Sequence, residues 1–164
     1  KPTQHIEETC LLLKPIHETD TDATDLAEAA NTNFECGDRA IEPHQNLLTT
    51  CDNWLVRQTV ISIFVDSDNP QVLLKVAKQA LADEEQTTKE TGILALSRLL
   101  NSPLKEEALQ LFSILAEDSF WRTRWRTAIS LTASQDAKAK ELLAKLQQDE
   151  HYRVVAAALE QPQS

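Results

Sequence analysis

Four short segments of this 164-residue chain share one pattern, in which a basic residue precedes small and aliphatic residues at helical spacing. The segments read VRQTVISIF at 56–64, TKETGILAL at 88–96, TRWRTAISL at 123–131 and YRVVAAAL at 152–159. Their basic residues, Arg57, Lys89, Arg124 and Arg153, follow one another at intervals of 32, 35 and 29 residues. Such a period is typical of repeated helical units that bury their apolar faces by stacking on neighbours.

A second segment with helical spacing follows each of the first three, at 70–81, 103–115 and 136–146. Asn69-Pro70 and Ser102-Pro103 each place an N-cap residue before a proline, which is tolerated at the first helical position. Ser134 or Asp136 is expected to begin the third helix. The apolar positions expected to face the core are Val72, Leu73, Val76, Ala77, Ala80 and Leu81, then Leu104, Ala108, Leu111, Phe112 and Leu115.

Acidic turns at 82–85, 116–119 and 147–150 close these second segments, and the helix after each turn approaches the pattern V-R-x-x-A-x-x-A-L. Over residues 52 to 160 this pattern resembles the short, PBS-lyase-type HEAT-like repeats, although Lys89 and Gly92 depart from it. The resemblance implies an all-α fold, an α-solenoid of antiparallel helix pairs with the second helices lining its concave side. It also implies a scaffold or adaptor.

The stretch FWRTRWRT at 120–127 contains two tryptophans and three arginines. Arg124 occupies the basic position of the repeat, and spacing on a helix predicts a single buried face. The residues of that face are Trp121, Trp125, Ala128, Ile129 and Thr132. Arg122 and Arg126 are then expected to be exposed near acidic turns, with binding of an anion or a partner's carboxylate as the alternative.

Residues 1–51 are predicted to form an irregular helical cap that includes an irregular first repeat, and residues 52–164 to form the HEAT-like repeats. The segment HQNLLTTCDNW, which begins at residue 44, is interpreted as the second helix of that first repeat. Asp20, Asp22 and Asp25 suggest a calcium loop, but Thr24 and Asp25 stand where the EF-hand pattern requires an oxygen ligand and glycine. Helix capping by Asp22 or Thr24 is therefore preferred.

Composition limits the partners of this chain. Two glycines and six prolines disfavour a turn-rich β fold, and no apolar run reaches the length of a membrane span. The net charge is −10, and residues 1–51 carry −7 of it through three basic and ten acidic residues. A negative field of this kind opposes nucleic acid.

The three cysteines, Cys10, Cys36 and Cys51, all lie in the first third of the chain. Cys36 and Cys51 are expected to form a disulfide, which favours an exported, periplasmic location, since such bonds persist in oxidising compartments. Three buried thiols in the cytoplasm are the alternative. The chain also lacks methionine, which is expected either after removal of a signal peptide or for a domain excised from a longer protein.

Catalytic and cofactor motifs are not evident. The four histidines and three cysteines lack metal-ligand spacing, and glycine only at 37 and 92 rules out Gly-rich phosphate-binding loops. We therefore expect no enzymatic activity, no metal and no cofactor.

The leading hypothesis is a non-enzymatic scaffold that binds another protein through the polar residues on the helix sides opposite the apolar faces. The alternative is that these residues are ordinary solvated surface. The candidate residues are Gln71, Lys75, Lys78 and Gln79, then Lys105, Glu106 and Gln110, then Lys138, Glu141 and Lys145, with Arg122 and Arg126 added from the arginine-rich stretch. Self-association through the last helix is a further expectation, because that unit ends after one helix.

The second hypothesis is a nucleic-acid-binding or base-repair HEAT-like protein. It would use the clusters Arg122, Arg124 and Arg126 with Lys138, Lys140 and Lys145, against the negative charge of the whole chain.

Overall fold

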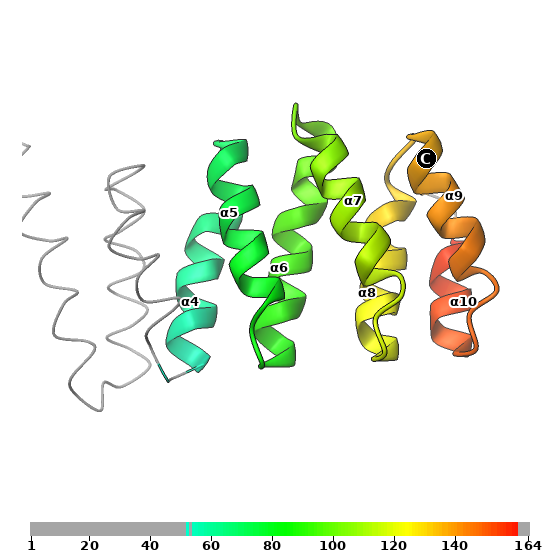
Figure 1. The fold of residues 1–164 in the computed structure, drawn as a ribbon, viewed down its shortest axis with the longest axis horizontal. Coiled ribbons are helices and arrows are strands. Elements are labelled where there is room, and N and C mark those ends of the chain that lie inside the picture. Colours follow the sequence, from blue (N-terminus) through cyan, green and yellow to red (C-terminus); the bar gives the residue numbers. More distant parts are fainter. Residues whose placement is uncertain (1–51, 53, 161–164) are drawn as a thin grey trace, which may run out of the picture. The chain divides into compact units, whose positions relative to one another are not determined.

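The computed structural model describes residue 52 and residues 54–160, and this part of the chain is entirely helical (Figure 1). It contains seven α-helices, one 3₁₀ helix and no strand. The helices are α4 (Trp54–Val65), α5 (Pro70–Leu81), α6 (Gln86–Arg98), η3 (Leu99–Asn101), α7 (Lys105–Leu115), α8 (Trp121–Thr132), α9 (Ala137–Leu146) and α10 (Tyr152–Leu159). The all-α expectation is thus confirmed, and no described helix has the length and hydrophobicity that a membrane span requires.

The chain divides into two compact units, Lys1–Gly92 and Ile93–Ser164, with the boundary inside α6. In the first unit α4 packs against α5, and in the second α8 packs against α10 while α9 contacts both. The predicted boundary between residues 51 and 52 lies at the edge of the described residues, so the predicted N-terminal cap stays a prediction.

Helix α5 begins and packs as its sequence predicts. The Asn69 side chain accepts hydrogen bonds from the backbone N–H groups of Gln71 and Val72, and Pro70 occupies the first helical position. The predicted apolar face is buried, apart from the half-buried Leu81; its buried members are Val72, Leu73, Val76, Ala77 and Ala80.

Gly92 marks a close approach of α6 to α5. A Cβ atom at this position would lie 2.6 Å from the Cβ of Ala80 and 3.3 Å from the Ala77 carbonyl oxygen. Glycine is intrinsically unfavourable inside a helix, so the departure from the repeat pattern at this position is explained by the space that α5 leaves.

Helix α7 begins later than predicted. The chain forms η3 first, where the Ser102 hydroxyl donates to the Leu99 carbonyl and accepts from the Leu104 N–H, and α7 then starts at Lys105. Ser102 is therefore not the N-cap of this helix, because its side chain is used within the preceding turn. Asp136 does cap α9, accepting from the Lys138 N–H at 2.9 Å, as one of the two predicted alternatives.

The buried face of α8 differs from the predicted one. Ala128 is buried as expected, but Trp121, Trp125 and Thr132 are only half-buried and Ile129 is 38% exposed. The residues that do lie buried are Thr123, Arg124, Thr127, Ala128 and Leu131. Threonines are small enough to let α8 pack closely, and Arg124 is buried together with a carboxylate partner.

Candidate functional site

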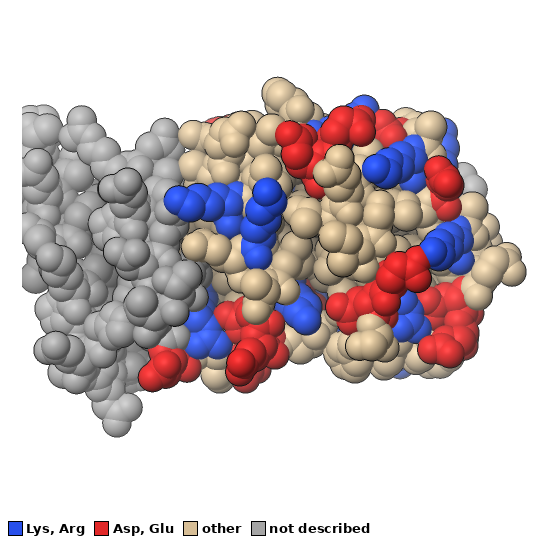
Figure 2. Space-filling view, viewed as in Figure 1, with Lys and Arg blue, Asp and Glu red and all other residues tan. Residues whose placement is uncertain are grey.

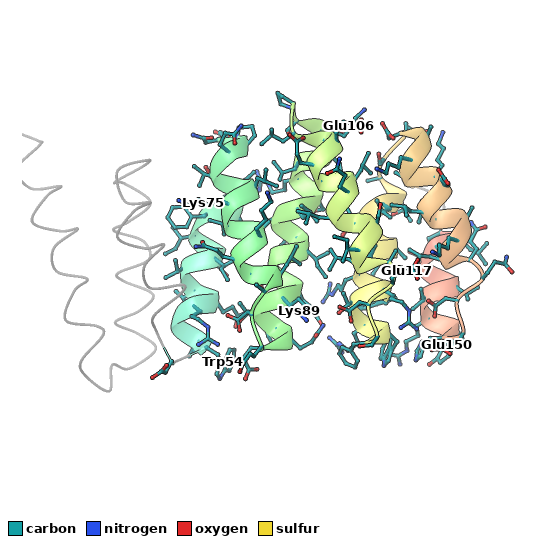
Figure 3. All side chains as sticks on the ribbon, in the orientation of Figure 1. Trp54, Lys75, Lys89, Glu106, Glu117 and Glu150 are labelled. Atoms are coloured by element: carbon teal, nitrogen blue, oxygen red, sulfur yellow. The ribbon has the colours of Figure 1, made fainter. Side chains whose placement is uncertain are left out.

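The polar residues predicted on α5 lie on its exposed side. Lys75 and Lys78 are exposed, while Gln79 is half-buried and its Oε1 atom accepts no hydrogen bond from the described residues. On the face drawn in Figure 2, basic side chains gather over α5, and Lys75 projects from this helix in Figure 3. The apolar residues of α5 point to the opposite side, as its amphipathic sequence requires.

The polar residues predicted in the second unit differ in exposure and in contacts. Gln110 on α7 and Glu141 on α9 are exposed, and their side chains make no hydrogen bond or ion pair within the described residues. Lys105 and Lys145 instead form ion pairs, with Asp136 at 2.6 Å and with Glu117 respectively. Glu106, like Gln71, is exposed, whereas Lys138 is half-buried.

The pair of Lys105 and Asp136 connects the first turn of α7 to the N-cap of α9. The hydrogen bond to Asp136 raises the pKa of Lys105, and the same bond lowers the pKa of Asp136. Both groups are therefore charged at neutral pH, and Lys105 is part of a structural contact.

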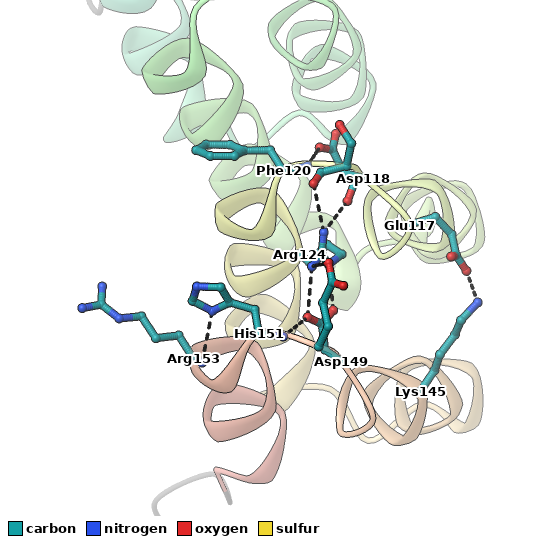
Figure 4. A network of polar contacts seen from close by, with 10 residues as sticks. Glu117, Asp118, Phe120, Arg124, Lys145, Asp149, His151 and Arg153 are labelled. Atoms are coloured by element: carbon teal, nitrogen blue, oxygen red, sulfur yellow. Dashed lines mark hydrogen bonds and ion pairs between the residues drawn. The ribbon is translucent and has the colours of Figure 1, made fainter.

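Arg124 forms the most extensive polar contact of the second unit (Figure 4). Its Nε and Nη2 atoms donate to the two carboxylate oxygens of Asp149 at 2.7 and 3.0 Å, and its Nη1 atom donates to the Asp118 carbonyl at 2.8 Å. Asp149 also accepts from the backbone N–H of His151, just before α10. This bidentate contact, which we call the Arg124 clamp, ties α8 to the turn that begins α10.

Arg57 makes the same kind of clamp in the first unit. It donates to both carboxylate oxygens of Asp83 at 2.7 and 3.0 Å and to the Asp52 carbonyl at 3.1 Å. Asp83 accepts in turn from the backbone N–H of Glu85, before α6. Two of the four basic positions of the repeat thus hold an aspartate from the next acidic turn, 26 and 25 residues downstream.

The clamps keep their carboxylates ionised. The hydrogen bond from Arg124 lowers the pKa of Asp149 below its ordinary value of 3.8. Burial by itself raises the pKa of Asp83, but hydrogen bonds from Arg57 and the Glu85 N–H outweigh it and lower that pKa. Each resolved shift of an aspartate thus favours the charged form.

The tryptophans and the other arginines of 120–127 form a partly exposed cluster. The guanidinium of Arg126 lies 4.9 Å from the ring centroid of Trp125, and that of Arg122 lies 6.0 Å from the ring of Trp121. Both arginines are half-buried rather than fully exposed, and each has its cationic group over an aromatic ring. Arg124, between them, reaches two acidic turns.

Sequence reasoning missed the aspartates of the two clamps. Asp83 and Asp149 were recognised only as parts of acidic turns, yet each lies at a nearly constant distance in sequence from a basic position of the repeat. That spacing is the signal that could have identified them. No group of residues suited to hold a metal ion occurs in the part of the chain described.

The predictions for Cys10, Cys36 and Cys51, and for the acidic segment at 20–25, concern residues outside the described ones. The predicted disulfide and the location inferred from it therefore stay predictions. The sequence matches no protein-family model, and no curated protein matches it significantly.

Proposed function

We propose that this protein is a non-enzymatic scaffold or adaptor, an α-solenoid of HEAT-like repeats that binds another protein through its second helices. The observation that carries the proposal is that each unit exposes polar side chains on its own second helices, α5 in the first unit and α7 and α9 in the second; we call them the second-helix residues. They are Lys75, Lys78, Gln110 and Glu141. None of them makes a side-chain hydrogen bond or ion pair within residues 54–160, so a partner can engage them without breaking internal contacts.

The repeated clamp supports the repeat interpretation. Arg57 and Arg124 occupy the same position of the sequence pattern and hold aspartates of the first and third acidic turns with equal Nε–Oδ2 distances. The same contact at matching positions of two units is expected when those units pack on their neighbours in the same way.

The charged groups support a role in binding rather than in proton transfer. A general acid or base works best with a pKa near the operating pH. The pKa values of Asp149 and Asp136 are instead moved further from neutral pH, because hydrogen bonds from Arg124 and Lys105 lower them. These carboxylates stabilise the fold in the form that is charged at neutral pH.

Contacts of the basic residues disfavour the nucleic-acid alternative. Arg124 is bound to Asp149 and to backbone carbonyls, and Lys145 is paired with Glu117. Phosphate binding by these two side chains would require breaking contacts that the fold already makes.

The test is affinity capture from an extract of the source cells with the wild-type protein and with a Lys75→Glu, Lys78→Glu variant. A protein retained by the wild type and lost with the variant is expected, because charge reversal at an interface adds repulsion. Lys145 is left unchanged, since its reversal would also break an internal ion pair.

The matched control is a Lys89→Glu, Lys140→Glu variant, which changes the net charge equally but alters two other positions. Far-UV circular dichroism verifies that both variants keep their helices. Retention of the same proteins by both variants would refute the assignment of binding to α5.

A further inference from the structure

Arg153 is the fourth basic position of the sequence pattern, and its contacts differ from those of Arg57 and Arg124. Arg57 and Arg124 each hold an aspartate from the next acidic turn. Within the described residues Arg153 makes no ion pair, and its Nε atom donates instead to the Tyr152 hydroxyl at 3.0 Å. Figure 4 shows its side chain extending past His151, away from Asp149.

Three aromatic side chains surround Arg153 and form with it what we call the Arg153 surface: Trp121, His151 and Tyr152. The rings of Trp121 and His151 stack with their centroids 4.0 Å apart and their planes 1° from parallel. The Arg153 guanidinium lies 5.6 Å from the Trp121 ring centroid and 5.8 Å from that of Tyr152. Tryptophan, tyrosine and arginine are the residues most enriched among binding hot spots.

The stacking decides which chemistry this surface offers. Trp121 already carries the imidazole of His151 and the guanidinium of Arg153 against its ring, so it does not present an open platform for a nucleic-acid base. The Nη1 and Nη2 atoms of Arg153 make no hydrogen bond within the described residues, and the N–H groups of a guanidinium are suited to a carboxylate. The surface is therefore suited to a carboxylate.

Apolar area lies on the same helix. Tyr152 is 71% exposed and Leu159 at the end of α10 is 59% exposed, whereas Val154, Ala157 and Ala158 on the other side of the helix are buried. Tyr152 directly precedes the basic residue Arg153. The residue that directly precedes Arg124 in α8 is Thr123, which is fully buried. The side of α10 that corresponds to a packed side of α8 is thus available to a partner.

We propose that the Arg153 surface binds an acidic turn at the start of a helix in another protein. A carboxylate of that turn would pair with Arg153, as Asp149 pairs with Arg124, and apolar residues of the helix would pack on Tyr152 and Leu159. The exposed Arg153 side chain can turn to meet it, because surface rotamers exchange within nanoseconds.

The charge distribution favours the acidic turn of another protein over a second copy of the chain as the ligand of the Arg153 surface. Residues 93–164 contain nine basic and nine acidic residues, so the unit that carries the Arg153 surface is neutral overall. A partner needs negative charge only in the turn that reaches Arg153. Two copies of this chain, each with a net charge of −10, would repel each other.

The experiment is a calorimetric titration of the full-length protein with a blocked synthetic peptide, QQDEHYRVVAAAL, whose sequence is that of residues 147–159. This peptide contains the acidic turn and helix that Arg124 holds in the structure. We expect saturable binding below about 1 mM, and Arg153→Glu is expected to weaken it by about tenfold or more. Arg153→Lys should weaken it less, because lysine keeps the charge but loses the bidentate fork.

Controls separate this surface from the second-helix residues. Lys140→Glu, in the same unit, and the Lys75→Glu, Lys78→Glu variant should leave the affinity unchanged, and a peptide with Asn and Gln in place of its Asp and Glu should bind more weakly than the parent. If only the Lys75→Glu, Lys78→Glu variant lost peptide binding, the peptide would be assigned to α5. That result would overturn this proposal without affecting the proposed function.

Three further results would also overturn it. The first is no saturable binding, or equal binding by the wild type and Arg153→Glu. The second is a single-stranded RNA decamer that binds in an Arg153-dependent way and competes with the peptide. The ligand of the Arg153 surface would then be nucleic acid and not an acidic protein segment. The third is Arg153-dependent dimerisation in sedimentation, which would make a second copy the occupant.

Discussion

Replacing Asp149 by asparagine removes the charge that holds Arg124 while keeping the size of the side chain. In the Arg124 clamp the side chains of arginine and aspartate are only 10% and 7% exposed. Removing one partner of a buried ion pair costs about 3–5 kcal/mol, because the other charge is left without compensation. Asparagine can still accept from Arg124 and from the His151 N–H, so we expect a loss of about 2–3 kcal/mol in the free energy of unfolding.

The matched control is Glu117→Gln, which also replaces a carboxylate by its amide and also breaks an ion pair. Glu117 and its partner Lys145 are 60% and 59% exposed, so solvent screens their attraction. An exposed pair contributes about 0–1 kcal/mol, and we expect the control to change stability by less than about 0.5 kcal/mol.

Both free energies are measured by urea unfolding, followed through tryptophan fluorescence and far-UV circular dichroism. A loss of 2–3 kcal/mol corresponds to a fall of roughly 5–10 °C in the melting temperature of a chain of this size. The double variant Arg124→Met, Asp149→Asn should lose less than the sum of its single variants, since the two residues interact directly. Equal losses for Asp149→Asn and Glu117→Gln would refute the role assigned to burial.

The same variant has a defined pH dependence. The Arg124 hydrogen bond lowers the pKa of Asp149 in the folded protein, so the unfolded chain takes up the proton first as the pH falls. The stability advantage of the wild type over Asp149→Asn is therefore fully present above the ordinary pKa of 3.8 and is lost as the pH falls through the lowered value. An advantage that instead disappeared between pH 6 and pH 8 would contradict this linkage.

Three further predictions concern packing, the last helix and the cysteines. Gly92→Ala should lower the free energy of unfolding by about 1–3 kcal/mol, because the new Cβ would lie 2.6 Å from that of Ala80. This clash outweighs the better helix propensity of alanine. Adding Ala80→Gly should recover part of the loss in the same urea assay. Truncation after Asp149 removes α10 and should cost several kcal/mol by exposing the α8 face that packs on it; an unchanged urea midpoint would show that α10 contributes nothing. Thiol titration of the unreduced, denatured protein should find one thiol if Cys36 and Cys51 are bonded, and three would disprove the pairing.

The start of α5 and the cap of α9 could be predicted from sequence because capping is local. Asn69 and Asp136 bond to N–H groups two or three residues away, so the relevant partners are already set by the chain. The apolar face of α5 was also predictable, because a single strongly amphipathic stripe leaves only one side to bury. The exposed positions Lys75, Lys78, Gln110 and Glu141 follow from the same periodicity.

Contacts between helices could not be predicted in the same way. Periodicity states which residues of α8 share a side, but the rotation of α8 against α10 decides which side is buried. Packing selects Thr123 and Thr127, whose small side chains permit close approach, and leaves Trp121 and Trp125 at the edge. The Arg153 surface results from that choice.

The sequence by itself determined the helices, their period and most of their ends, because these depend on residues within about one turn of one another. Only the tertiary structure decided that Arg124 is buried with Asp149, that Gly92 faces Ala80, and that Trp121 stacks on His151. Each of these contacts joins residues at least 12 positions apart in sequence. Their geometry depends on how helices pack, which a local pattern does not specify.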